Sequence, residues 1–130
     1  MAEDTPRIRR APIPDDALII VRGEVPPARA RRLADQFRQR FPGWGRWGLS
    51  AFYAGSDLEV DHLAYDRLQG YEVLHVYPTS VLLRAGFEVV PTFRRPHVTI
   101  CWTDALDTGL DRLDRAEHAR QENPYHGSWE

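Results

Sequence analysis

Short runs of β-branched and aromatic residues alternate with helical segments along this chain, and glycine or proline ends most of them. Apolar runs of roughly four to eight residues are typical of strands, and apolar residues three and four apart are typical of helices. The order β-α-β-α-β-α-β-β-α therefore predicts an α+β (α/β-like) domain: a mixed five-stranded sheet with helices packed on it. The strands are expected at residues 17–21, 49–53, 71–77, 87–90 and 97–102, and the helices at 26–41, 57–69, 80–85 and 108–121.

The length of 130 residues and a hydrophobic share of 42% fit one domain with a single core. Residues 1–14 are expected to form a flexible arm, because three prolines prevent a helix there. Residues 15–124 form the predicted globular domain, and residues 125–130 a C-terminal tail. Within the domain, Ser56 and Glu59 have the S-x-x-E spacing of a capping box, which predicts a helix start.

Several classes of protein are excluded by what the chain lacks. The lone cysteine, Cys101, excludes a disulfide framework, and no window reaches the roughly 18 consecutive apolar residues of a membrane span. The N-terminus has no secretory signal, so a cytoplasmic protein is expected. No histidine or cysteine spacing matches a zinc motif, and no Walker or Rossmann glycine pattern follows a strand, so neither a metal nor a cofactor is expected.

Arginine supplies all 17 basic residues, and it is unevenly distributed although the net charge is only −2. Residues 1–46 hold ten arginines and six acids, whereas residues 47–130 hold seven arginines and thirteen acids. Arg32 and four further arginines share one face of the first predicted helix. Such a face binds phosphate backbones through bidentate contacts and counterion release, or it is a solvated surface; both interpretations stay open.

Trp44 and Trp47 flank Arg46 in the glycine-rich loop that follows this helix. Aromatic rings beside a guanidinium form a sequence-tolerant platform for unpaired bases. These three residues are therefore candidate contacts for single-stranded RNA. Alternatively, they cover the core.

The stretch from residue 97 to residue 102 carries the most informative pattern. Side chains alternate along a strand, so the apolar residues at 98, 100 and 102 share one face, while His97, Thr99 and Cys101 share the other. A histidine in this position can act as a general acid/base beside a hydroxyl that binds a phosphate oxygen. The alternative is a half-exposed strand face on which His97 pairs with a neighbouring group. Cys101 is interpreted as a small buried apolar residue.

Four other residues are candidates for contact with an anion. Arg22 ends the first predicted strand beside a flexible glycine, where it would serve as a clamp or form a salt bridge to a local acid. Ser50 lies early in the second strand, next to a glycine that would admit a ligand. Thr92 and Arg94, between the last two predicted strands, are candidate phosphate contacts.

Short motifs resemble those of known families. His97-Val-Thr-Ile100 resembles one half of the duplicated H-x-T motif of the 2H phosphoesterases, which implies action on cyclic phosphates or RNA ends. Val21-Arg-Gly23 and Phe52-Tyr-Ala54, each followed by a helix, resemble the opening of ADP-ribosyltransferase-fold toxins. That second resemblance implies an NAD site built from Arg22, Ser50 and Glu88 in this order.

The whole chain also resembles a family of small single-domain bacterial proteins. The shared motifs are VRG, GLS, AGF followed by PT, and PHVT. The resemblance implies common landmarks at Arg22, Ser50, Thr92 and His97, and it implies no activity.

Together these features favour a metal-independent, RNA-directed enzyme of toxin-like size, such as the toxin of a toxin–antitoxin pair. His97 would be the acid/base, Arg22 would stabilise the charge on phosphorus, and Ser50 and Thr99 would bind phosphate oxygens. The alternatives are an NAD-dependent ADP-ribosyltransferase and a non-catalytic, antitoxin-like module that binds a cognate protein. Placement distinguishes them: a pocket shared by Arg22, Ser50 and His97 favours the first, whereas Glu88 in place of His97 favours the second.

Overall fold

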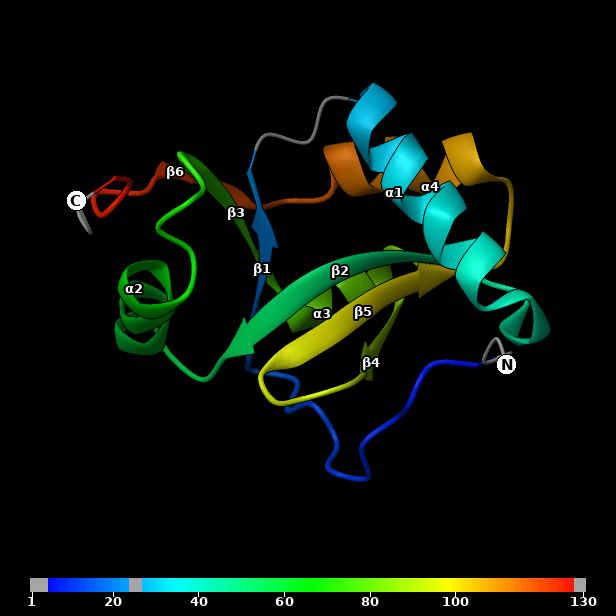
Figure 1. Ribbon diagram of the computed structural model, residues 1–130, viewed down its shortest axis with the longest axis horizontal. Coiled ribbons are helices and arrows are strands. Elements are labelled where there is room, and N and C mark those ends of the chain that lie inside the picture. The colour runs from blue at the N-terminus through cyan, green and yellow to red at the C-terminus, as the bar shows by residue number, and fades with distance from the viewer. Residues whose placement is uncertain (1–4, 24–26, 128–130) are drawn as a thin grey trace.

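A computed structural model describes residues 5–23 and 27–127 (Figure 1). Within these residues the chain forms an α+β fold, with four α-helices packed against a six-stranded sheet. None of these helices is long and apolar enough to cross a membrane. The strands are β1 (Leu18–Arg22), β2 (Trp47–Ala54), β3 (Val73–Pro78), β4 (Glu88–Pro91), β5 (His97–Trp102) and β6 (Ala119–Glu122); the helices are α1 (Pro27–Arg40), α2 (Asp57–Asp66), α3 (Thr79–Arg84) and α4 (Leu106–Arg115), with a 3-10 turn, η1 (Pro42–Trp44), after α1.

The strands follow the spatial order β4-β5-β2-β1-β3-β6, and every neighbouring pair is antiparallel. The prediction of a mixed five-stranded sheet is therefore wrong in both strand direction and strand number. The helical connections from β2 to β3 and from β3 to β4 return the chain in the same direction, so these three strands run parallel to one another, with β1 between β2 and β3 and β5 between β2 and β4. In contrast, β1 and β2 are antiparallel neighbours although α1 connects them. The alternation of strands and helices therefore predicts neither the direction of β1 nor which strand is inserted beside another.

The sixth strand replaces the second half of the helix predicted over residues 108–121. α4 ends at Arg115, and the next residue, Ala116, has an extended backbone (φ −63°, ψ 139°). β6 then pairs with β3 through its backbone while all four of its side chains are exposed. Because this edge strand buries neither face, its sequence shows no apolar alternation that would distinguish it from a helix.

Other predicted boundaries are confirmed. β5 spans His97–Trp102 as predicted, and β4 and β5 form the expected antiparallel hairpin. Ser56 begins α2 as its N-cap, because its side chain accepts a hydrogen bond from the backbone N–H of Glu59 at 3.3 Å.

Apolar side chains pack on both faces of the sheet. Along β1, Ile19 and Val21 belong to one core and Ile20 to the other, as alternation along a strand requires. Leu82 of α3 and Leu113 of α4 join the first core, and α2 covers the second. Figure 1 shows α2 well apart from α1 and α4, with α3 behind the sheet. α1 packs on β2 and on α4.

The segment before β1, predicted as a flexible arm, contains no helix in its described part but is bonded to the end of β4. Ile8 forms a β-bridge with Thr92, and the backbone N–H of Arg9 donates to Pro91 at 2.7 Å. The Arg9 guanidinium donates to the carbonyls of Thr92 and His97 at 2.7 and 2.9 Å. This segment therefore positions the turn between β4 and β5.

Two glycines allow aromatic rings to lie against the backbone. A Cβ at Gly48 would be 2.5 Å from the ring of Phe37, and a Cβ at Gly109 would overlap the indole of Trp102. Side chains larger than hydrogen do not fit at these distances. The two contacts fix α1 on β2 and α4 on β5.

We expect Gly109→Ala to lower the free energy of unfolding by about 1–3 kcal/mol, the usual cost of overpacking a filled core. Without the indole above it, alanine in a helix interior would instead stabilise by about 1 kcal/mol. Gly70→Ala is the matched control, since nothing lies within 4 Å of a Cβ there. Urea denaturation followed by circular dichroism measures both, and a stabilising effect of Gly109→Ala would contradict the close packing.

Candidate functional site

One face of the β2–β5 pair carries the polar residues that the sequence singled out. In the antiparallel register, Ser50 lies opposite Thr99, and Phe52 lies opposite His97. The core on this face of the sheet includes no residue of β5 among those described. The polar side chains of β5 are therefore free to contact one another and the neighbouring strands.

His97 is held between two hydroxyl groups. Its Nε2 lies 2.5 Å from Ser50 Oγ, and its Nδ1 lies 2.8 Å from Thr92 Oγ1. Thr92 Oγ1 in turn lies 2.7 Å from Thr99 Oγ1. Both threonines have an exposed fraction of 0%, whereas Ser50 and His97 are half-buried. A continuous hydrogen-bonded chain thus runs from the buried threonines, through the imidazole, to the hydroxyl of Ser50.

The available donors determine the direction of the hydrogen bonds on the two sides of His97. Arg22 Nη2 donates to Ser50 Oγ at 3.4 Å, which uses a lone pair of Oγ and leaves its proton for His97. On the other side of the ring, a hydrogen bond with the Thr92 backbone favours a proton on the imidazole. We therefore assign the tautomer with the proton on Nδ1, in which Nε2 accepts the Ser50 proton.

The surroundings of His97 keep its imidazole neutral. Burial lowers the pKa of His97 to about 4, and the positive charges of Arg22 and Arg9 add to this effect. The hydrogen bond with the Thr92 backbone opposes the shift. At pH 7 the ring is therefore uncharged, and its Nε2 is a proton acceptor.

Ser50 lines a cavity of about 380 Å³ between α1, β1 and β2. Arg22, Arg29 and Arg40 line this cavity, and its described lining includes no carboxylate. His97 is not part of the lining, so Ser50 stands between the imidazole and the cavity. The volume is that of a small-ligand site, and the charge suits an anion.

Aromatic rings hold Arg22 at the end of β1. Its guanidinium lies over the ring of Phe52 at 5.2 Å and over the ring of Tyr71 at 5.3 Å from the centroids. Arg29 Nη1 donates to the backbone carbonyl of Arg22 at 3.3 Å, which ties α1 to β1 beside the cavity. In the described part of the chain Arg22 has no ion-pair partner, so its charge is available to a ligand.

Glu88, the acid of the alternative NAD site, does not join Arg22 and Ser50. It lies on the edge strand β4, where its carboxylate pairs with Arg46 at 3.3 Å. It does not line the cavity. Of the two trios weighed from the sequence, the one that contains His97 is connected by hydrogen bonds, although only Arg22 and Ser50 of this trio line the cavity.

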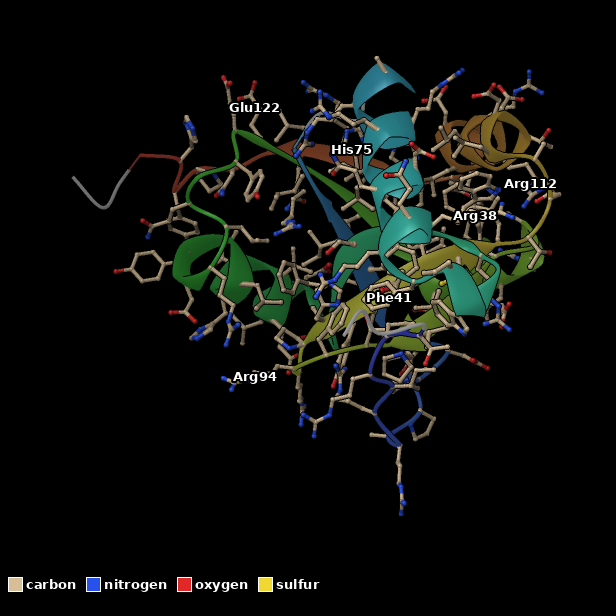
Figure 2. All side chains as sticks on the ribbon, turned by 45° about the vertical axis from the view of Figure 1, so that its right-hand side comes forward. Arg38, Phe41, His75, Arg94, Arg112 and Glu122 are labelled. Carbon is tan, nitrogen blue, oxygen red and sulfur yellow. The ribbon has the colours of Figure 1, made fainter. Side chains whose placement is uncertain are left out.

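The remaining candidates lie away from the cavity. The Arg46 guanidinium covers the ring of Trp44 at 4.8 Å, and the indole N–H of Trp47 donates to a backbone carbonyl before α4 at 3.0 Å. Arg32 is exposed on α1. Figure 2 shows Arg94 extending outward from the turn between β4 and β5. None of these side chains lines the cavity beside Ser50.

Three polar residues of α1 that line the cavity were not predicted as site residues. They are Arg29, Gln36 and Arg40. Gln36 lies seven positions after Arg29, and Arg40 lies eleven positions after it. Residues at these spacings share one face of a helix, so the signal is present in the sequence. The sequence alone does not show which face of α1 meets Arg22, and the two arginines were grouped with the others of the helix.

A larger cavity, of about 540 Å³, lies between α1, α4 and β3. Its polar groups are largely paired: Arg31 with Asp107 at 2.5 Å, and the hydroxyl of Tyr77 with the carbonyl of Leu113 at 3.2 Å. Across the described residues, no three metal-ligating side chains come together. The Ser50–His97 pair is therefore the arrangement on which a chemical role can be based.

We expect the ring protons of His97 to titrate with a pKa of about 4, against about 6.5 for an unperturbed histidine. Arg22→Ala raises this pKa because it removes the larger of the two charge effects. Arg84→Ala, on an exposed residue of α3, is the control and leaves it unchanged. A pH titration followed by NMR measures all three, and a wild-type value near 6.5 would contradict the burial of a neutral ring.

Comparison with known proteins does not assign the chain to a family. No protein-family model, no curated protein and no solved structure matches the chain. The resemblances drawn from short motifs therefore stay predictions, and the candidate site rests on its own geometry.

Proposed function

We propose that the protein is an RNA-directed enzyme acting on phosphodiesters, with His97 as the acid/base and Arg22 as the phosphate clamp. The observation that supports this most is the contact of Arg22, Ser50 and His97 at the wall of an arginine-lined cavity. Phosphodiester cleavage needs a group that takes a proton from the attacking oxygen and a cation that stabilises charge on the phosphoryl oxygens. The trio supplies both.

The charge around the cavity suits a phosphate in two ways. Arginine binds phosphate oxygens through two parallel donors, and three arginines line the space. A bound phosphate also offsets the positive charge of Arg22 next to His97, and a nearby negative charge favours the protonated imidazole. Substrate binding therefore raises the pKa of His97 from about 4 toward the range in which a base is most effective at pH 7.

Single-stranded RNA fits the surroundings of the cavity. Tyr71 lines the cavity beside Arg22, and aromatic rings stack on unpaired bases. α1 forms one wall, and its exposed arginines, including Arg32, extend the positive charge along the helix. A strand with one phosphate at Arg22 would meet further cations along α1.

The other two functions receive less support from the geometry. ADP-ribosyl transfer from NAD places an acid beside Arg22 and Ser50, whereas Glu88 is paired with Arg46. In a purely protein-binding module His97 would be structural, and the arginine-lined cavity would have no role. Docking of a cognate partner on the arginines of α1 is compatible with the enzymatic function.

We expect His97→Ala to reduce cleavage of single-stranded RNA by at least about 100-fold, because general acid/base catalysis contributes about 10²–10⁴. His62→Ala, at an exposed residue of α2, is the matched control and retains full activity. Cleavage of end-labelled RNAs of several sequences is measured on gels, with and without EDTA, and EDTA should have no effect. Equal cleavage by wild type and His97→Ala, or none above background in either, contradicts the proposal.

Arg22→Lys keeps the charge but removes the two parallel donors, so we expect it to reduce kcat/KM substantially while Arg22→Ala reduces it further. The loss of one such stabilising group costs about 10²–10³ in rate. Arg84→Lys is the control on the surface of α3. Steady-state kinetics on a fluorogenic RNA give these values, and equal effects of Arg22→Lys and Arg84→Lys would show that Arg22 does not touch the phosphate.

A further inference from the structure

We propose that Ser50 is the nucleophile of this site and that the reaction passes through a covalent phosphodiester of its hydroxyl. The proposal rests on the proposed function for its phosphate substrate. The activation of Ser50, however, is a property of the chain itself and can be measured with any reactive phosphorus compound.

Ser50 has the surroundings of an activated nucleophile. A base, His97 Nε2, lies 2.5 Å from its Oγ, and that base is itself oriented by Thr92 at 2.8 Å. Nucleophile, base and orienting group in this sequence are the pattern of hydroxyl activation. Ser50 and Arg22 both line the cavity, and Ser50 Oγ accepts a hydrogen bond from Arg22, so a phosphorus atom bound there would be next to both residues.

The geometry argues against direct activation of a substrate hydroxyl by His97. For that, Nε2 would have to face the cavity. Nε2 is instead occupied by Ser50 Oγ, and His97 does not line the cavity. Ser50 Oγ is the oxygen hydrogen-bonded to Nε2, so it is the first to lose its proton. Once Oγ bonds to phosphorus, this hydrogen bond is lost, and the half-buried imidazole can exchange protons with the leaving oxygen and with water.

The imidazole is also held on its Nδ1 side, which keeps Nε2 aligned with Ser50 Oγ. Thr92 and Thr99 are fully buried and bonded to each other, and Arg9 donates to the His97 carbonyl at 2.9 Å. The backbone N–H of His97 donates to the backbone carbonyl of Arg94 at 2.8 Å. Thr92 is thus a positioning residue, which acts on Ser50 through His97.

The reaction is balanced in two steps. In the first, Ser50 Oγ attacks phosphorus, the Oγ–P bond forms and the bond from phosphorus to the leaving oxygen breaks; the Oγ proton moves to His97 Nε2 and then to the leaving oxygen. In the second, water attacks phosphorus and gives a proton to His97, the Oγ–P bond breaks, and His97 returns the proton to Oγ. Arg22 stabilises the phosphoryl oxygens in both steps. No ribose 2′-hydroxyl takes part, so single-stranded DNA is also cleaved.

The test uses diisopropyl fluorophosphate, which phosphorylates activated serines. We expect a single adduct on Ser50 of the wild-type chain, located by mass spectrometry of the intact protein and its peptides. Ser50→Ala forms no adduct, whereas Ser80→Ala, at an exposed serine of α3, is labelled like the wild type. His97→Gln keeps a hydrogen-bond acceptor but cannot take a proton, and it slows labelling by at least about 100-fold.

Two further readouts distinguish an effect of His97 and Thr92 on the reactivity of Ser50 from a purely structural role. The labelling rate of the wild type rises as His97 loses its proton, with a midpoint at a pH of about 4, and is then constant to pH 7; the charged groups that face His97 are Arg22 and Arg9. Thr92→Val slows labelling, and Thr92→Ser, which keeps the hydroxyl, restores it. Circular dichroism confirms that each variant is folded.

Labelling at Ser50 that depends on His97 supports the inference even if no RNA is cleaved, in which case only the proposed substrate fails. The absence of an adduct on Ser50, or equal labelling of wild type and His97→Gln, overturns it. Cleavage of RNA by Ser50→Ala at the wild-type rate also overturns it, and this result leaves the proposed function intact.

Discussion

The pairing of β2 with β5 is the constraint on which both the sheet and the candidate site depend. It places Ser50 opposite Thr99 and Phe52 opposite His97, and a slip of one residue would turn each of these side chains to the other face. Burial of the alternate residues Val98 and Ile100 holds the register. Each such side chain contributes about 1.5–3 kcal/mol, whereas a hydrogen bond contributes about 1 kcal/mol net. Burial of the apolar face of β5 therefore fixes the position of the side chains on its polar face.

The polar face is stable because each buried group has a partner. An unpaired buried hydroxyl costs about 1–3 kcal/mol, and Thr92 and Thr99 avoid this cost by bonding to each other and to His97. The same burial, together with the charge of Arg22, disfavours the protonated imidazole. One arrangement thus produces both a satisfied interior and a neutral base, and the aromatic rings of Phe52 and Tyr71 hold the arginine in place without neutralising it.

The sequence predicts the parts of this site that follow from period-two alternation. The span of β5, the face that carries His97, and the placement of Arg22 at the end of β1 all come from local patterns. Ser50 lies on the predicted strand, but β2 begins at Trp47, so Ser50 is in its middle rather than near its start. The parts it misses depend on how elements dock. Arg29 and Arg40 line the cavity because α1 packs on β2, where Gly48 admits the ring of Phe37. The antiparallel order and the exposed strand β6 were missed for the same reason, since both arise from pairing with strands distant in sequence.

Thr99 shows how a motif on a strand differs from the site it suggests. Residues two apart on a strand lie on one face, so Thr99 stands beside His97 and was expected to bind phosphate. Its hydroxyl is instead fully buried and bonded to Thr92. The hydroxyl that contacts His97 Nε2 belongs to Ser50, which lies on the neighbouring strand, diagonally across from His97 and directly opposite Thr99. The hydroxyl partner of His97 on β2 is therefore set by strand order rather than by the H-x-T spacing, and strand order here comes from the insertion of β2 between β1 and β5.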